Sequence, residues 1–250
     1  MRYVLKIAYD GTHFAGWQRQ KNAISVQETL ENAVQTALGK TVTITASGRT
    51  DAGVHAAGQI CHFDEATITV PPEKMPDCLN AFLPANVRVL EGWSAPNTFH
   101  STRSAKRKTY VYSLYVSGRE MPLKERYAVR IDSAPNLQTL QKTAALMQGE
   151  HDFKAFCASG SSVQTTVRTV YEVRVEESYS FGGRDLKIYV TGNGFLYNMV
   201  RTMVGELLDL ANGKRTEESL QQAFACGKRD LLGKTMPAKG LTLLNVEYDK

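Results

Sequence analysis

The order of strand-like and helix-like patterns constrains this chain more than any other feature. In the first half, alternating apolar residues predict a strand at 3–9, and an apolar period of 3.6 residues predicts a helix at 26–38. Ser25 and Glu28 make a capping-box pattern before that helix, and Gly39 ends it. Further elements are expected at 42–44 (strand), 60–63 (strand), 71–84 (helix) and 87–89 (strand). The resulting order, β-α-β-β-α-β, is typical of a split βαβ or ferredoxin-like fold.

The second half repeats this order loosely. Strands are expected at 109–116, 169–176, 187–190 and 243–248, and helices at 137–147, 195–210 and 217–225. The sequence therefore predicts an α+β protein with two ferredoxin-like halves, 1–98 and 99–250. We expect antiparallel sheets in both halves, with a central cleft between them. Such a cleft is a usual place for a functional site.

The composition is that of a soluble globular protein. Hydrophobic residues make up 42% and charged residues 22% of the chain, and no run of 18 apolar residues predicts a membrane span. The N-terminal residues lack a signal-peptide pattern. A net charge of +5 permits a polyanionic partner without requiring one. The four cysteines lie far apart with no CxxC pair, which favours unpaired thiols in a reducing cytosol.

No metal site is expected from the histidines and cysteines. His55, Cys61 and His62 lie close in sequence, but no fourth residue has a spacing typical of metal ligands. His13 and Trp17 lie in a glycine-flanked loop, where they either line a pocket or pack in the core.

The segment 48–56, Gly-Arg-Thr-Asp-Ala-Gly-Val-His-Ala, is the most informative in the chain. It joins two expected strands and places one cation, Arg49, and one carboxylate, Asp51, between glycines. Glycines let the backbone turn sharply and let a substrate approach closely. The alternative is a polar turn, which this segment taken alone favours, because Asp and Gly are common turn residues.

A basic segment precedes the expected strand at 109–116. Its cations include Arg103, Lys106 and Lys108, and the strand begins with Tyr110. Cations contact phosphates and an aromatic ring stacks on a base, so the segment is compatible with nucleic-acid binding. A solvated loop before an ordinary tyrosine-containing strand explains it equally well.

The expected helix at 195–210 carries Arg201 at the rim of its apolar face. A partly desolvated guanidinium needs a carboxylate partner or an anionic ligand. Gly205, one turn further on, lets another backbone come close. Taken alone, Arg201 is more often a structural ion-pair partner than a functional cation.

Together these segments resemble the tRNA pseudouridine synthases of the TruA family. The similarity runs from Phe-Ala-Gly-Trp-Gln-Arg-Gln at 14–20 to the Gly-Leu pair at 240–241, and the Gly-Arg-Thr-Asp-Ala-Gly-Val-His motif is highly specific for this family. The resemblance implies that Asp51 is the catalytic aspartate and that Arg49 helps to displace the target base. It also implies that Tyr110 stacks on the target uracil and that Arg201 pairs with the aspartate.

Further expectations follow from the same resemblance. Leu241, or else Leu243, lines the base pocket, and the basic residues Arg103, Lys106 and Lys108 bind tRNA. The family implies a cytoplasmic homodimer that needs no metal or organic cofactor and isomerises uridines 38–40 of the anticodon stem-loop to pseudouridine. The isomerisation adds and removes no atoms, which agrees with the lack of a cofactor motif. The residues leave open whether Asp51 attacks the sugar or acts as a base.

Two other function classes compete with this interpretation. A non-catalytic RNA-binding module also suits basic loops and tyrosine-bearing strands, although no RNP-type aromatic motif is present. A nucleoside hydrolase is the third class. Hydrolysis uses two carboxylates in partnership, whereas the loop at 48–58 offers one, so the sequence favours isomerisation.

Overall fold

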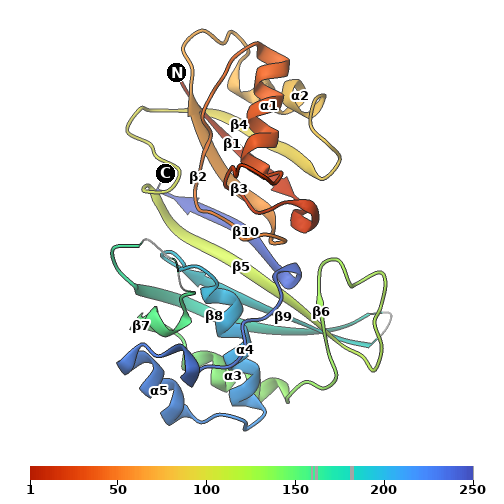
Figure 1. The fold of residues 1–250 in the computed structure, drawn as a ribbon, viewed down its shortest axis with the longest axis vertical. Helices are drawn as coiled ribbons and strands as arrows, with labels where there is room; N and C mark the ends of the chain where they lie inside the picture. Colours follow the sequence, from red (N-terminus) through yellow and green to blue (C-terminus); the bar gives the residue numbers. More distant parts are fainter. Residues whose placement is uncertain (159, 161–162, 181–182, 250) are drawn as a thin grey trace. The chain divides into compact units, whose positions relative to one another are not determined.

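The computed structural model describes residues 1–158, 160, 163–180 and 183–249, and it confirms a mixed α+β protein (Figure 1). The chain divides into two compact units. Unit 1 consists of Met1–Lys106 and Thr242–Lys250, and unit 2 of Arg107–Leu241. The division thus falls after residue 106 and not after residue 98, and the last strand groups with the first unit because it pairs there with a strand of that unit.

Unit 1 is a mostly antiparallel sheet with two α-helices. Its elements are β1 (Arg2–Tyr9), α1 (Val26–Leu38), β2 (Thr45–Ala46), β3 (His55–Asp64), α2 (Met75–Asn80), β4 (Val87–Ala95) and β10 (Leu241–Tyr248). Strand β1 pairs antiparallel with β3 and β4, and β2 pairs antiparallel with β3. Strand β10 pairs parallel with the first residues of β3, so β2 and β10 pair with different ends of that strand.

Helix α1 has the bounds that the apolar period predicts. Ser25 accepts a hydrogen bond from the backbone N–H of Glu28 at 3.2 Å, as an N-cap residue does. Gly39 ends the helix in the left-handed conformation, with φ of 66°. The buried face includes Val26, Leu30 and Val34, and α1 contacts α2 on one side of the sheet (Figure 1).

Three local expectations for unit 1 were wrong. Residues 42–44 form no strand, because the N–H of Ile44 donates to Glu31 Oε1 of α1 at 2.9 Å instead of to a strand partner. Strand β3 begins at His55, so the loop expected over 48–58 is shorter. The helix expected at 71–84 is shorter, because α2 covers only Met75–Asn80.

Unit 2 contains five β-strands and three α-helices among its described residues. Its elements are β5 (Ala105–Val116), β6 (Val129–Ile131), α3 (Leu137–Ala145), β7 (Gly149–Asp152), β8 (Val167–Ser180), β9 (Gly183–Gly192), α4 (Met199–Ala211) and α5 (Glu217–Cys226). The strand order is β5-β9-β8-β7, all antiparallel, and β6 pairs parallel with β5. The short strands β6 and β7 lack an alternating apolar pattern, and the sequence did not predict them.

Helix α4 is the most buried helix of unit 2 and packs against α3. Residues on the apolar face of the helix expected at 195–210 are buried: Leu196, Val200, Met203, Val204 and Leu207. The helix begins at Met199 and not at residue 195, because Asn198 adopts the left-handed conformation with φ of 64° and so cannot continue a right-handed helix backwards.

The described part of the chain has neither a membrane-spanning helix nor a metal-binding cluster. No helix among them has the length and apolar character needed to cross a membrane. Within the same residues, no group of three or more His, Cys, Asp and Glu side chains is arranged to hold a metal ion.

Candidate active site

Asp51 lies on the connection between β2 and β3, residues 47–54, which we call the aspartate loop. Hydrogen bonds hold its first residues to β3: Ser47 N donates to Ile60 O at 2.7 Å, and Gln59 Nε2 donates to Gly48 O at 2.9 Å. Asp51 itself is half-buried and Arg49 is exposed. The loop is therefore anchored to the sheet while the carboxylate at its centre remains partly accessible.

A second loop, residues 10–17, packs directly on the aspartate loop. Trp17 N donates to Thr50 O at 3.0 Å, and the Thr50 hydroxyl lies 2.8 Å from that of Tyr9. Gly16 has φ of 93°, and a Cβ at this position would lie 2.5 Å from Thr50 O. Thr50, immediately before Asp51, is thus held through both its backbone and its side chain. Only a glycine at position 16 fits this close contact.

The sequence did not identify this supporting role of residues 10–17. Trp17 packs in the core with 2% of its surface exposed, and its ring centroid lies 6.3 Å from that of Tyr9. His13 is exposed. Burial raises the pKa of Tyr9 to about 12, so its hydroxyl keeps its proton for the bond with Thr50. The signal that could have revealed the contact was the pair of glycines at 11 and 16.

The cations Arg103 and Lys106 lie on the surface of unit 1. The loop that carries Arg103 is fixed by Ser101 Oγ, which donates to Thr45 O at 2.8 Å, and by Thr102 Oγ1, which donates to Ala46 O at 2.7 Å. Arg103 is exposed. Lys106 Nζ lies 2.8 Å from Asp249 Oδ2, but both side chains are more than half exposed, so this ion pair contributes little stability.

Lys108, on β5 in unit 2, differs from these surface cations. It pairs with Gly192 of β9 and is only partly exposed. Desolvation lowers the pKa of Lys108 to about 8, and the positive charge of Arg168 adds to the shift. The lysine therefore remains largely protonated at pH 7 but loses its proton far more readily than a surface lysine.

Tyr110 of β5 has 8% of its surface exposed. Its ring meets that of Phe195 edge-on, at 5.3 Å between centroids and 90° between planes. Tyr112, two residues on, donates its hydroxyl to Pro237 O at 2.6 Å, and burial raises its pKa. Tyr112 therefore holds the segment that leads into Leu241, while Tyr110 is oriented by an aromatic contact.

Arg201, on the first turns of α4, is held by uncharged oxygen acceptors. Its Nε donates to Met236 O at 2.7 Å and its Nη1 donates to Asn198 Oδ1 at 2.6 Å. In return, Met236 N donates to Arg201 O at 3.2 Å. The sequence predicts a carboxylate partner or an anionic ligand for this guanidinium, and the structure adds that carbonyl and amide oxygens bind two of its three nitrogens.

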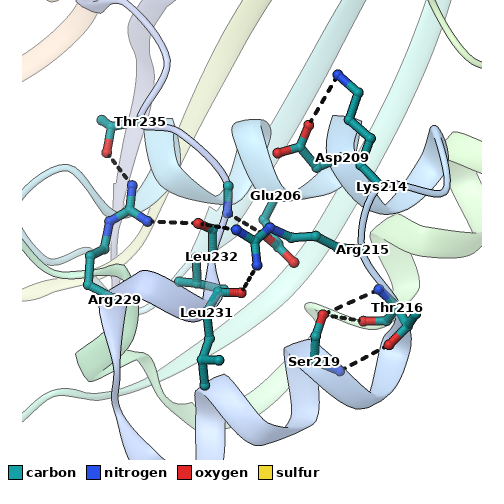
Figure 2. A network of polar contacts seen from close by, with 11 residues as sticks. Glu206, Asp209, Lys214, Arg215, Thr216, Ser219, Arg229, Leu231, Leu232 and Thr235 are labelled. Atoms are coloured by element: carbon teal, nitrogen blue, oxygen red, sulfur yellow. Dashed lines mark hydrogen bonds and ion pairs between the residues drawn. The ribbon is translucent and has the colours of Figure 1, made fainter.

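The segment that delivers the Met236 carbonyl, residues 229–237, is called the strap here. Gly233 N of the strap donates to Glu206 Oε2 of α4 at 2.6 Å. Arg215 Nη2 donates to Leu232 O at 2.9 Å, and Arg229 Nη2 donates to Thr235 Oγ1 at 3.0 Å within the strap (Figure 2). Burial raises the pKa of the Glu206 carboxyl. The strap is thus fixed to the region around α4 by several polar contacts.

The structure distributes the expected site residues over both units. Arg49 and Asp51 share the aspartate loop of unit 1, whereas Tyr110 and Arg201 belong to unit 2. Leu241 and Leu243 are both buried on β10, with Leu243 next to β3, where it pairs with Ala56.

A family model described as tRNA pseudouridine synthase matches residues 6–101 and 143–249 of this chain. The chain belongs to the tRNA pseudouridine synthase family. It is 41% identical over 241 residues to the tRNA pseudouridine synthase A of Halalkalibacterium halodurans, with 96% of this chain and 90% of the relative covered. It is 39% identical over 252 residues to that of Bacillus subtilis, with both chains covered completely. The resemblance indicated by the motifs is confirmed, and with it the class of enzyme, an isomerase.

The packing of Gly16 predicts a large effect of substitution. In Gly16→Ala, the new Cβ would meet Thr50 O at 2.5 Å and the backbone would be held at φ of 93°, so we expect unfolding to be easier by about 2–4 kcal/mol. Gly39→Ala is the matched control, since φ is 66° there but no atom lies within 4 Å, and we expect about 1 kcal/mol. Urea denaturation measures both, and equal losses would contradict a tight contact at Gly16.

The lowered pKa of Lys108 predicts a pH-dependent stability. The unfolded chain binds this proton up to about pH 10.4, whereas the folded chain releases it near pH 8. The folded state is therefore penalised at pH 7 and gains stability as the pH rises. Relative to Lys108→Met, the wild type should gain about 1–2 kcal/mol between pH 7 and pH 9.5. Urea denaturation at both pH values tests this against the surface control Lys106→Met, and equal pH dependence in both variants would contradict it.

Proposed function

We propose that this enzyme converts uridine to pseudouridine in the anticodon stem-loop of tRNA, at positions 38–40, with Asp51 as the catalytic carboxylate. Family membership and near-full-length relatives named tRNA pseudouridine synthase A support the substrate and the reaction. The observation that carries the assignment of Asp51 is its loop, because the residue before it is fixed by close packing while the carboxylate remains partly accessible. Such preorganisation suits a group that must meet a reacting atom.

The target base must first leave the helical stack, which costs a few kcal/mol. Exposed Arg49 is suited to fill the gap that the base leaves, and Arg103, Lys106 and Lys108 are suited to bind the phosphates. Stacking on the face of Tyr110 would recover roughly 1–3 kcal/mol. Phe195 contacts the Tyr110 ring edge-on and so fixes the orientation of that ring for stacking.

The chemical step exchanges one bond of the sugar for another. The bond from ribose C1′ to uracil N1 breaks, a bond from C1′ to C5 forms, the C5 proton leaves and N1 gains a proton, so no atom is added overall. In our proposal the ionised Asp51 acts at the ribose, as nucleophile or as base. Arg201 serves as the cation that favours its charged form. Leu241 forms part of the apolar wall that keeps the detached uracil in place while it rotates.

We further propose that the protein is a cytoplasmic homodimer, that both halves have a ferredoxin-like fold, and that the functional site lies in a cleft. In unit 1, the antiparallel order β4-β1-β3-β2 supports the fold assignment, since it is the order of a split βαβ arrangement. The dimer rests on the family resemblance, and sedimentation that shows a fully active monomer would contradict it.

Asp51→Asn removes the charge while keeping the volume of the side chain. We expect the dissociation constant for unmodified tRNA to stay within about threefold and the rate of pseudouridine formation to fall by at least about a thousandfold. Chemical detection of pseudouridine measures the rate, with Asp132→Asn as the control, because Asp132 is an exposed carboxylate in an ion pair with Arg130. Turnover close to wild type in Asp51→Asn would refute the assignment. Release of free uracil by the wild type would indicate a hydrolase, and binding without any product an RNA-binding module.

Tyr110→Phe keeps the aromatic face and the contact with Phe195 but removes the hydroxyl. Because stacking depends on the ring, we expect tRNA affinity to be unchanged. We expect the single-turnover rate to fall about 100-fold, because we assign the hydroxyl to proton transfer in the reaction. Single-turnover kinetics with excess enzyme measures this, and a near-normal rate would reduce Tyr110 to a stacking platform.

A further inference from the structure

Asn198 has an unusual backbone conformation that helix capping does not explain. Among the described residues it is the one non-glycine residue with positive φ, 64°. It immediately precedes α4, yet its side chain makes no capping hydrogen bond to the first turn of the helix. Asparagine tolerates the left-handed conformation better than most residues, but glycine adopts it at less cost. The side chain at this position therefore needs another explanation.

The amide oxygen of Asn198 faces the guanidinium of Arg201 instead. Asn198 Oδ1 accepts a hydrogen bond from Arg201 Nη1 at 2.6 Å, a short distance for a bond from a cation to a neutral oxygen. Arg201 Nε donates to the Met236 carbonyl at 2.7 Å. Because a guanidinium is planar and rigid, bonds at two of its nitrogens fix both its plane and its direction.

The two acceptors are not equally secure. Met236 belongs to the strap, which contacts α4 at several points: a Cβ on Gly205 would overlap Lys234 O, the hydroxyls of Thr202 and Thr235 lie 3.0 Å apart, and Gly233 N donates to Glu206. The Met236 carbonyl is therefore held by many contacts that do not involve Arg201. Asn198 Oδ1, by contrast, is a single side-chain atom, so the bond that it accepts from Arg201 Nη1 depends on that one side chain.

We propose that Asn198 is a positioning residue for the pseudouridine reaction: its left-handed backbone brings the amide oxygen to Arg201 and aims the guanidinium. This inference rests on the proposed function, in which Arg201 serves Asp51. A neutral acceptor suits this role because it orients the guanidinium without neutralising its charge. An ion pair with a carboxylate at the same place would compete with the anion that Arg201 is proposed to serve.

Two substitutions separate the hydrogen bond from the backbone conformation. Asn198→Gly removes the acceptor but accommodates φ of 64° without strain, whereas Asn198→Ala removes the acceptor and also strains the backbone. If Asn198 aims Arg201, both variants should lose about 10- to 100-fold in single-turnover rate, although the alanine variant should lose more thermal stability because it also strains the backbone. The dissociation constant for tRNA should stay within about threefold in the glycine variant. Asn212→Gly is the matched control, since it changes an asparagine at the other end of α4 and should keep the wild-type rate.

The experiment uses the full chain with unmodified tRNA and includes Arg201→Ala. A wild-type rate in Asn198→Gly would overturn the inference. If Asn198→Ala were slow in the same experiment, the rate would depend on the backbone conformation of residue 198 and not on its amide oxygen. Weaker tRNA binding with an unchanged rate would also overturn it. In either case a loss of activity in Arg201→Ala would leave the proposed function standing. If the wild type forms no pseudouridine, or if Arg201→Ala keeps the full rate, the proposed function or its use of Arg201 fails, and the inference fails with it.

Discussion

Contact between the loop at 10–17 and the aspartate loop is the interaction on which the proposed catalytic carboxylate depends. Thr50 is held by the backbone of Trp17 and by the hydroxyl of Tyr9, and Gly16 allows the two backbones to approach. A loop of this length would cost considerable conformational entropy to fix without such contacts. The packing contacts therefore offset the conformational entropy lost by the loop during folding, before any substrate binds.

Unit 2 positions its cation by the same principle. Gly205 lets the strap lie against α4, and the strap then presents the Met236 carbonyl to Arg201. A fully buried carboxylate, Glu206, accepts a hydrogen bond from the strap backbone and lies 3.6 Å from Arg215. In both units, a glycine allows a close backbone contact that fixes a loop, and the loop in turn positions a side chain of the proposed active site.

Strongly periodic segments made much of the fold predictable from sequence. Helix α1 has the expected bounds because its apolar period, its N-cap Ser25 and its stop at Gly39 agree with one another. The strand expected at 42–44 failed because a distant carboxylate, Glu31, binds the Ile44 N–H, and periodicity carries no information on such a contact. Helix α4 was expected to begin too early because its apolar pattern continues through Leu196 while the backbone reverses its handedness at Asn198.

The candidate site was predictable from the sequence only in part. Its motifs identified the family, and the glycines at 16 and 205 occupy positions where a side chain would clash. The acceptors of Arg201 were not predictable, because Met236 lies 35 residues further along the chain and contributes only its backbone oxygen. Side-chain identity reveals little about which backbone carbonyl a distant segment will present.

The most direct measurement of the central claim is a crystal structure of this enzyme with an anticodon stem-loop RNA that carries 5-fluorouridine at the target position. The account predicts an everted target nucleotide whose ribose or base lies within roughly 3.5 Å of the Asp51 carboxylate, with the aspartate loop in its present conformation. A target nucleotide bound away from residue 51, or an aspartate loop that refolds to reach it, would contradict the account.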